Sequence, residues 1–309
     1  MKKNFINIDN FSKDQILRII AISTNFKSGK VVRASIRKRD SHNDKTGILI
    51  FEKPSLRTKL SFFKALNILG FDPIYFSPEE VGMGQRERIA DMAKVVSKMS
   101  DLIILRTFKH ETIEEFADNS SVPVINALSD QEHPCQALGD LLTITENIDT
   151  SLEEVKLTFV GDGNNVATSL AKAFSLLGGT FIHCVPQGFE IQEDQMDQIN
   201  QYNSKSNGQF ILERDLKKAT AETDFIYTDV WTSMGQESEK KDRLEKFKEF
   251  QITEEILTNS SGKFMHDLPA NHGEEISEGL LDHPQSIVFD QAENRTWGQA
   301  GIIHYIFSD

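Results

Sequence analysis

The sequence predicts an α/β protein of two domains, each built on a parallel sheet with helices on both faces. Three observations lead to this prediction. The 309 residues exceed what a single hydrophobic core usually holds. Short apolar runs rich in β-branched and aromatic residues recur along the chain, which is typical of buried strands. Amphipathic stretches of helical length separate these runs, as crossover helices separate parallel strands.

The apolar runs give the expected strands in order. They cover residues 47–51, 73–76, 102–105, 122–125, 157–160, 181–185, 225–227, 264–266 and 287–289. Helical periodicity between them predicts helices over residues 60–69, 88–98, 112–117, 137–146, 166–177 and 238–247. A last helix over residues 294–307 could close either domain.

A polar stretch near the middle of the chain marks the expected domain junction. Residues 146–154, ENIDTSLEE, interrupt the apolar pattern after a helix that starts at Pro134. We therefore expect domains of residues 1–147 and 148–291. Parallel α/β sheets bind ligands beyond the carboxyl ends of their strands, so the loops after the strands are the expected place for chemistry.

Composition excludes several functional classes. A net charge of -13 opposes binding to nucleic acid or to anionic lipid, and no window reaches the apolar length of a membrane helix. The N-terminal residues do not resemble a secretory signal, so a cytoplasmic location is expected. Cys135 and Cys184 are far apart and lack a metal-binding pattern, which predicts buried free thiols.

The loop after the first expected strand has the features of an anion site. Residues 55–59, SLRTK, open a helix and combine two hydroxyls with two cations. Helix N-termini add unpaired amides and a positive dipole end. The alternative is an ordinary helix cap with basic residues on the surface, and spacing alone does not decide between the two.

Three segments of the first half resemble one family in the right order. Residues 53–59, KPSLRTK, resemble the carbamoyl phosphate loop of the aspartate and ornithine carbamoyltransferase family. Residues 104–110, ILRTFKH, end the third expected strand and are a further match to this family. Residues 132–140 resemble its HPxQ signature. The resemblance implies a carbamoyl phosphate domain over residues 1–147, with a C-terminal helix at 292–309 packing back on it.

The resemblance also implies the roles of individual residues in this half. The phosphate would be bound by Ser55, Leu56, Arg57, Thr58 and Arg106, and the carbamoyl group by His133, Gln136 and Arg295. Attack by an amine builds negative charge on the carbonyl oxygen, so Arg106, His133 and Thr58 would act as an oxyanion hole. The departing phosphate can accept the proton of the amine, and the reaction then needs no cofactor, metal or covalent nucleophile.

The second half carries the implied acceptor site. Residues 161–165, GDGNN, lack the third glycine of a dinucleotide fingerprint and instead resemble the GDxNN turn of ornithine carbamoyltransferases. Residues 228–237 resemble their DxWxSMG loop, and residues 266–270 and 289–295 resemble HCLPA and FDQAENR. This implies an ornithine domain over residues 148–291, with ligand contacts from Asn165, Asp229, Ser233 and Met234. The catalytic group would also include Asp267, and the main-chain carbonyls of Asp267 and Leu268 would bind the carbamoyl NH2.

The implied activity is transfer of the carbamoyl group of carbamoyl phosphate to the side-chain amine of L-ornithine, giving L-citrulline and phosphate for arginine biosynthesis. The family's assembly implies a homotrimer, or a multiple of trimers, with shared active sites. Three residues depart from the family pattern: Asp267 replaces the cysteine of HCLP, Lys59 replaces an arginine, and Gly82 replaces a glutamine.

These departures leave alternatives open. The acceptor could be 2,4-diaminobutyrate, lysine or putrescine, or the chain could be a ligand-binding paralogue without activity. A nucleotide-dependent dehydrogenase is a remote third reading. An aspartate beside Asp229 would couple two carboxylates, which raises the proton affinity of one or requires a cation.

Overall fold

The computed structural model describes residues 3–30, 45–84, 86–232, 235 and 237–308, and divides into two compact units. Unit 1 comprises Met1–Leu142 with Glu293–Asp309, and unit 2 comprises Thr143–Ala292. Two helices run across the boundaries between the units, namely α6 (Pro134–Thr145) and α12 (Val288–Phe307). No helix in the described residues is long and apolar enough to cross a membrane.

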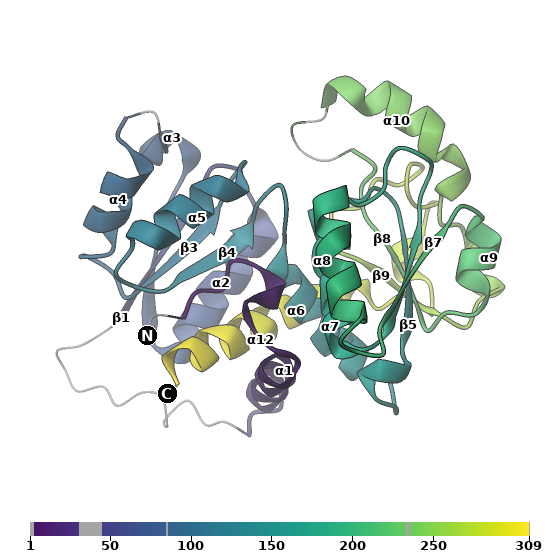
Figure 1. The fold of residues 1–309 in the computed structure, drawn as a ribbon, viewed down its shortest axis with the longest axis horizontal. Helices are drawn as coiled ribbons and strands as arrows, with labels where there is room; N and C mark the ends of the chain where they lie inside the picture. The colour runs from purple at the N-terminus through teal and green to yellow at the C-terminus, as the bar shows by residue number, and fades with distance from the viewer. Residues whose placement is uncertain (1–2, 31–44, 85, 233–234, 236, 309) are drawn as a thin grey trace. The chain divides into compact units, whose positions relative to one another are not determined.

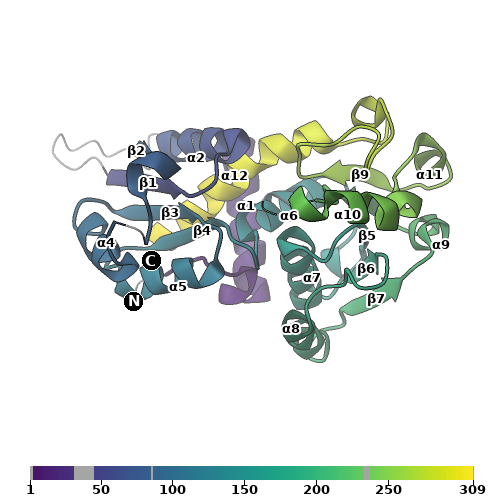
Figure 2. The same cartoon turned by 90° about the horizontal axis from the view of Figure 1, so that it is seen from above.

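Unit 1 is built on a four-stranded parallel sheet with the order β2-β1-β3-β4 in its described part. The strands are β1 (Lys45–Phe51), β2 (Phe71–Phe76), β3 (Leu102–Arg106) and β4 (Val124–Leu128). The helices are α1 (Lys13–Lys27), α2 (Leu56–Leu69), α3 (Pro78–Val81), α4 (Ile89–Val96) and α5 (His110–Asn119), with a 3-10 turn η1 (Ile8–Asn10). Figure 2 shows α2 and α12 on one face of this sheet and α4 and α5 on the other.

Unit 2 contains a five-stranded parallel sheet with the order β7-β6-β5-β8-β9 in its described part. The strands are β5 (Lys156–Val160), β6 (Thr180–Cys184), β7 (Gln209–Glu213), β8 (Phe225–Thr228) and β9 (Lys263–His266). The helices are α7 (Asn165–Leu177), α8 (Glu193–Asn203), α9 (Leu216–Ala221), α10 (Lys240–Phe247) and α11 (Glu254–Thr258), with 3-10 turns η3 (Leu152–Glu154), η4 (Glu237–Glu239), η5 (Lys248–Phe250) and η6 (Leu280–Asp282). In Figure 1, α7 and α8 cover one face of this sheet and α9 the other.

The predicted fold class is confirmed, but several elements differ, and the short helices α3, α8, α9 and α11 are not among those predicted. Residues 287–289 do not form a strand, because Val288 begins α12 and is buried as part of that helix. The sequence patterns did not identify β7, an edge strand whose Ile211 and Leu212 are exposed. They also did not identify α1, which Ser12 caps by accepting a hydrogen bond from the Gln15 N–H.

Each sheet has one point where the strand order changes direction. In unit 1 it lies between β1 and β3, and in unit 2 between β5 and β8. Helices that follow neighbouring strands at such a point leave on opposite faces, which opens a crevice at the carboxyl ends. The loops after β1 and β3, and those after β5 and β8, are therefore the places where ligands are expected.

Both cysteines are free and buried, as predicted. Burial raises the pKa of each thiol to about 12, so neither is a thiolate near neutral pH.

Candidate active site

The loop after β1 forms the N-terminus of helix α2. Ser55 is the N-cap residue, and its Oγ accepts a hydrogen bond from the Thr58 N–H over 3.3 Å. The backbone at Ser55 is extended, as is usual for an N-cap residue, and the first amides of the helix after it have no partner within the helix. The side chain of Leu56 is 77% exposed, so this residue offers its backbone rather than its side chain.

Arg295 joins this helix from the far end of the chain. Its Nη2 donates to Thr58 Oγ1 over 2.7 Å, and both side chains are buried. A glycine favours the close approach of Arg295 to α6, because a Cβ on Gly139 would lie 3.2 Å from the backbone N of Arg295. The structure therefore brings together Ser55, Thr58 and Arg295.

The end of β3 supplies a second cation. Arg106 is the last residue of β3 and is buried, and its carbonyl accepts a hydrogen bond from the Glu52 N–H over 2.7 Å. This bond places the end of β3 beside the end of β1. The register agrees, since Phe51 pairs with Arg106.

His133 and Gln136 lie at the start of α6 and are both almost fully buried. Gln136 Nε2 donates to Asp140 Oδ1 over 2.9 Å, whereas Gln136 Oε1 has no hydrogen-bond partner among the described residues. The Nε of Arg57 is likewise buried without a partner among them. Buried polar atoms in native proteins are normally satisfied, so unpartnered atoms at a strand-end loop are consistent with a ligand that supplies the missing partner.

In unit 2 the loop after β5 lies close to the backbone at Glu190 and Ile191. A Cβ on Gly163 would lie 2.2 Å from the backbone N of Ile191, so only glycine fits there. Asn164 caps α7 by accepting from the N–H groups of Val166 and Ala167, and its Nδ2 donates to Asp229 Oδ2 over 2.7 Å.

The sequence interpretation had selected Asn165 as a ligand contact and had passed over Asn164. Asn165 is the first residue of α7 and is half-buried. Asn164 makes a different contact, because its side chain orients Asp229. An asparagine directly before an apolar helix is a cap signal that could have identified this residue.

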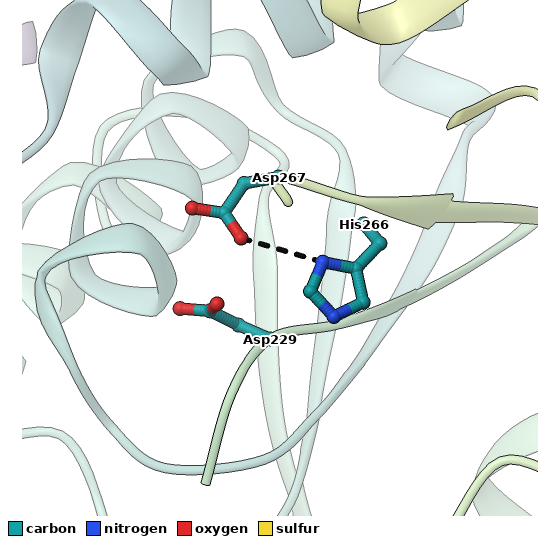
Figure 3. A group of neighbouring side chains, drawn as sticks. All are labelled: Asp229, His266 and Asp267. Carbon is teal, nitrogen blue, oxygen red and sulfur yellow. Dashed lines mark ion pairs between the residues drawn. The ribbon is translucent and has the colours of Figure 1, made fainter. Parts of the chain in front are cut away.

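Asp229, His266 and Asp267 form a cluster at the ends of β8 and β9 (Figure 3). One ligand atom from each lies within 4.8 Å of the others. Asp229 Oδ1 also accepts from the Val230 N–H over 2.7 Å. Burial, followed by the charge of Asp267, raises the pKa of Asp229 well above its usual range.

The two ring nitrogens of His266 are both engaged. Nδ1 accepts a hydrogen bond from the Leu268 N–H over 2.9 Å, and Nε2 donates to Glu275 Oε1 over 3.2 Å. Although burial opposes its charge, hydrogen bonding to Asp267 and Glu275 raises the pKa of His266 to about 9. Asp267 Oδ1 lies 3.5 Å from Nδ1, and Figure 3 draws this ion pair. In the neutral form of the ring, the Leu268 N–H would place the proton on Nε2.

This arrangement bears on metal binding. Within the described residues, Asp229, His266 and Asp267 are the one group with the spacing of a metal site. A neutral imidazole binds a metal through a free nitrogen lone pair, and here Nδ1 already accepts the Leu268 N–H. The cluster therefore fits a ligand that donates hydrogen bonds better than it fits a metal ion.

Two of the four expected acceptor contacts, Ser233 and Met234, lie outside the described residues. The segments on either side of them are well anchored. Arg243 of α10 donates to Asp162 Oδ2 over 2.9 Å and to the Trp231 carbonyl over 3.1 Å. The chain is thus fixed before and after the loop.

Comparison with known proteins assigns both units. Residues 3–146 match the family model described as "Aspartate/ornithine carbamoyltransferase, carbamoyl-P binding domain". Residues 153–306 match the one described as "Aspartate/ornithine carbamoyltransferase, Asp/Orn binding domain". The chain belongs to the aspartate/ornithine carbamoyltransferase family.

Relatives in this family match over nearly the whole chain. The ornithine carbamoyltransferase of Methanobrevibacter smithii is 40% identical over 295 residues, which are 95% of this chain and 96% of the relative. The anabolic ornithine carbamoyltransferase of Pyrococcus furiosus is 38% identical over 303 residues, which are 97% of this chain and 95% of the relative.

Solved structures of the family share the fold. The ornithine carbamoyltransferase from Pyrococcus furiosus has a TM-score of 0.90 at 38% identity, covering 98% of this chain and 96% of that one. The anabolic enzyme from Campylobacter jejuni has a TM-score of 0.90 at 32% identity, covering 98% of each chain.

Lys59, Gly82 and Asp267 depart from the family pattern, and the structure gives a local explanation for Lys59 and Gly82. Lys59 places its Nζ 3.6 Å from the centre of the Tyr75 ring, so it makes a cation–π contact. Gly82 ends α3 with φ of 53°, a conformation that favours glycine over glutamine. Asp267, the third departure, stands in the cluster described above.

Proposed function

We propose that this chain transfers the carbamoyl group of carbamoyl phosphate to the side-chain amine of L-ornithine, giving L-citrulline and phosphate in arginine biosynthesis. The observation that carries this proposal is the match to relatives named ornithine carbamoyltransferase over nearly the full length of both proteins. The loops at the strand ends of both units supply the chemistry that such a reaction needs.

In this proposal residues 1–147, with the helix at 292–309, bind carbamoyl phosphate, and residues 148–291 bind the amino acid. The phosphate is held at the N-terminus of α2 by Ser55, the amide of Leu56, Arg57 and Thr58, with Arg106 as a further cation. The unpartnered Nε of Arg57 supports this assignment, because a phosphate oxygen would satisfy it.

The carbamoyl group occupies the neighbouring position. Its oxygen accepts hydrogen bonds from Thr58, Arg106 and His133, with Gln136 and Arg295 as supporting donors. The amine nitrogen attacks the carbonyl carbon, a carbon–nitrogen bond forms, and negative charge develops on this oxygen. The carbon–oxygen bond to phosphate then breaks, and the leaving phosphate takes the proton that the amine loses. Donors fixed in advance stabilise the charged intermediate more than the substrate.

The acceptor is bound in unit 2. Asp229 meets an ammonium group, while Asn165, Ser233 and Met234 bind the polar groups of the amino acid. The hydrogen bond from Asn164 to Asp229 supports this reading, since it holds that carboxylate at the end of β8. The main-chain carbonyls of Asp267 and Leu268 accept the carbamoyl NH2, and no cofactor is required.

We further propose that the enzyme works as a homotrimer, or a multiple of trimers, in the cytoplasm. Ile74 and Phe76 on the edge strand β2 and Leu60 on α2 expose apolar surface, which suits contact with another copy of the chain. The two free cysteines fit a reducing compartment.

A screen of acceptors tests the proposed function. The purified protein is given carbamoyl phosphate with ornithine, 2,4-diaminobutyrate, lysine or putrescine, and both phosphate release and the ureido product are measured. We expect ornithine to be used with a kcat/KM at least tenfold above any other amine. An Arg106→Ala variant should lose transfer while retaining its fold.

The other outcomes of the acceptor screen would each contradict part of the proposal. Preference for a different amine would replace ornithine in the proposal. Phosphate release with no ureido product from any amine would identify a hydrolytic side reaction and refute carbamoyl transfer. No turnover at all would favour a ligand-binding paralogue.

A further inference from the structure

The loop that leads from β4 to His133 is closed by hydrogen bonds between its own ends. The Ser129 N–H donates to the Glu132 carbonyl over 2.9 Å, and the Glu132 N–H donates to Ser129 Oγ over 3.2 Å. Both residues are almost fully buried. After the loop, the His133 carbonyl accepts hydrogen bonds from the N–H groups of Gln136 and Ala137 at the start of α6. The backbone is therefore held on both sides of His133.

Residues 4–8, here called the N-terminal segment, lie along the edge of β4 (Figure 1). Phe5 forms a parallel bridge with this strand, in which the Phe5 N–H donates to the Val124 carbonyl over 2.9 Å and the Asn126 N–H donates to the Phe5 carbonyl over 2.8 Å. Asn126 Nδ2 also donates to the Ile6 carbonyl over 2.9 Å. Among the described residues β4 is an outer strand of the sheet, so the segment pairs with main-chain groups at that edge.

The end of the N-terminal segment contacts the loop before His133. The Ile8 N–H donates to Glu132 Oε2 over 3.1 Å, and both residues are buried. A hydrogen bond to a carboxylate is stronger than one between neutral groups. Glu132 is thus bound through its N–H, its carbonyl and its side chain. The side chain is the part that connects this loop to residues 124 positions away in the sequence.

We infer that Glu132 is a positioning residue for His133: its carboxylate, held by the Ile8 N–H, sets the course of the backbone into the histidine. This inference rests on the proposed function, in which His133 donates to the carbonyl oxygen of carbamoyl phosphate. A donor to a developing charge acts only if it is in place beforehand, and a small misplacement removes much of its effect. The bond between Ile8 and Glu132 therefore contributes to kcat more than to the binding of either substrate.

Two variants remove this hydrogen bond from opposite sides. Glu132→Ala removes the acceptor, and Ile8→Pro removes the donor. The backbone accepts proline there, because Ile8 is the first residue of the 3-10 turn η1 and Asn7 has φ of -119° and ψ of 154°, the extended conformation that a following proline favours. Ile8→Ala is the matched control, since it keeps the N–H while deleting more of the buried side chain than proline does.

Steady-state kinetics with each substrate varied in turn gives the first readout. Loss of an oxyanion donor lowers kcat about 10²- to 10³-fold, so misplacement of His133 in Ile8→Pro or Glu132→Ala should lower kcat about tenfold or more. KM for each substrate should change by less than about threefold. The double variant should lose no more than the more affected single variant, because both changes remove one bond. Ile8→Ala leaves that bond in place and should keep kcat within about twofold of the wild type.

A background without the imidazole distinguishes positioning from a general structural role. In His133→Ala the donor is absent, so adding Ile8→Pro or Glu132→Ala should lower the remaining kcat by less than about twofold. A change that only loosens the fold would lower kcat by the same factor in both backgrounds. Equal factors would therefore overturn the inference, and so would a loss that appears in KM alone.

Amide hydrogen exchange of the full chain tests the same contact without turnover. Glu132→Ala should raise exchange both in the N-terminal segment and in residues 129–137, whereas Ile8→Ala should raise it in the N-terminal segment alone. A wild type that forms no citrulline refutes the proposed function, and the exchange pattern still decides whether Glu132 holds the loop. Unchanged protection of residues 129–137 in both Glu132→Ala and Ile8→Pro would refute the positioning role even in an active enzyme.

Discussion

At the scale of single residues, the cationic side chains of the phosphate loop have separate tasks. Arg295 is held by Thr58, whereas Arg57 keeps a buried Nε without a partner among the described residues. Arg57 is therefore the side chain whose removal should affect the bound anion with little effect on the fold.

We expect Arg57→Ala to raise KM for carbamoyl phosphate about ten- to hundredfold, because a charged hydrogen bond contributes about 1.5–3 kcal/mol. KM for the acceptor should change much less. Steady-state kinetics with each substrate varied in turn measures both effects. Arg18→Ala, an exposed arginine that stacks on Tyr305, is the matched control and should leave both constants unchanged. Equal effects on both substrates would contradict the assigned role.

The buried side chain of His183 leads to a prediction about how the stability of the fold depends on pH. It is fully buried among aromatic rings, and its Nε2 donates to the Gly161 carbonyl over 3.0 Å. Burial lowers the pKa of His183 to about 4 from its usual 6.5. Between these values the unfolded chain binds a proton that the folded chain excludes, so stability falls as the pH drops from about 6.5 to 4.

This shift corresponds to about 3 kcal/mol in total. In His183→Gln, which keeps a donor for Gly161, the unfolding free energy should lose this part of its pH dependence. Denaturant titrations at several pH values between 4 and 7 measure the difference from the wild type. Parallel curves for the two proteins would show that His183 does not contribute.

At the scale of elements, α10 is attached to the β5 loop by a buried ion pair. Arg243 bonds Asp162, and the two side chains are 8% and 12% exposed. The same guanidinium lies 5.1 Å from the centre of the Phe189 ring. Trp231 and α10 are thereby both attached to the loop that carries Asn164.

Arg243→Met should destabilise the fold by about 3 kcal/mol, because it leaves a buried carboxylate without its partner. Adding Asp162→Asn should recover at least half of that loss. Chemical denaturation of both variants tests this prediction. Lys217→Met, which breaks an exposed pair with Glu255, should have no measurable effect. A double variant less stable than Arg243→Met would contradict the explanation.

The elements also show where the sequence patterns were reliable. Strands buried on both faces, such as β3 and β5, were predicted because most residues along them are apolar. The edge strand β7 has an exposed, mixed pattern that resembles a loop. The short apolar run at residues 287–289 has no period of its own, so it fits a strand as well as a helix, and the long helix α12 decides its conformation.

At the scale of the whole molecule, the proposed assembly gives a prediction about mass. A trimer would have three times the 35.0 kDa mass of the chain. Replacing both Ile74 and Phe76 by lysine should reduce the trimer to smaller species, because charged residues on the exposed strand β2 would oppose burial. Sedimentation equilibrium measures the masses.

Ile211→Lys is the matched control, since Ile211 is also exposed on an edge strand, β7 of unit 2. It should leave the mass unchanged. If only this control variant dissociates, the contact surface lies on unit 2 and the proposed one is wrong.

The sequence by itself determined the fold class, the order of the strand-end loops and the residue types that they carry. It could do so because hydrophobic periodicity, cap residues and loop motifs are local properties of the chain. Only the tertiary structure decided which of these residues meet. The contact between Arg295 and Thr58 joins residues 237 positions apart, and it depends on the packing of α12 against α6 and α2. Asp267 stands beside Asp229 because parallel strands β8 and β9 pair in one register, which no local pattern encodes.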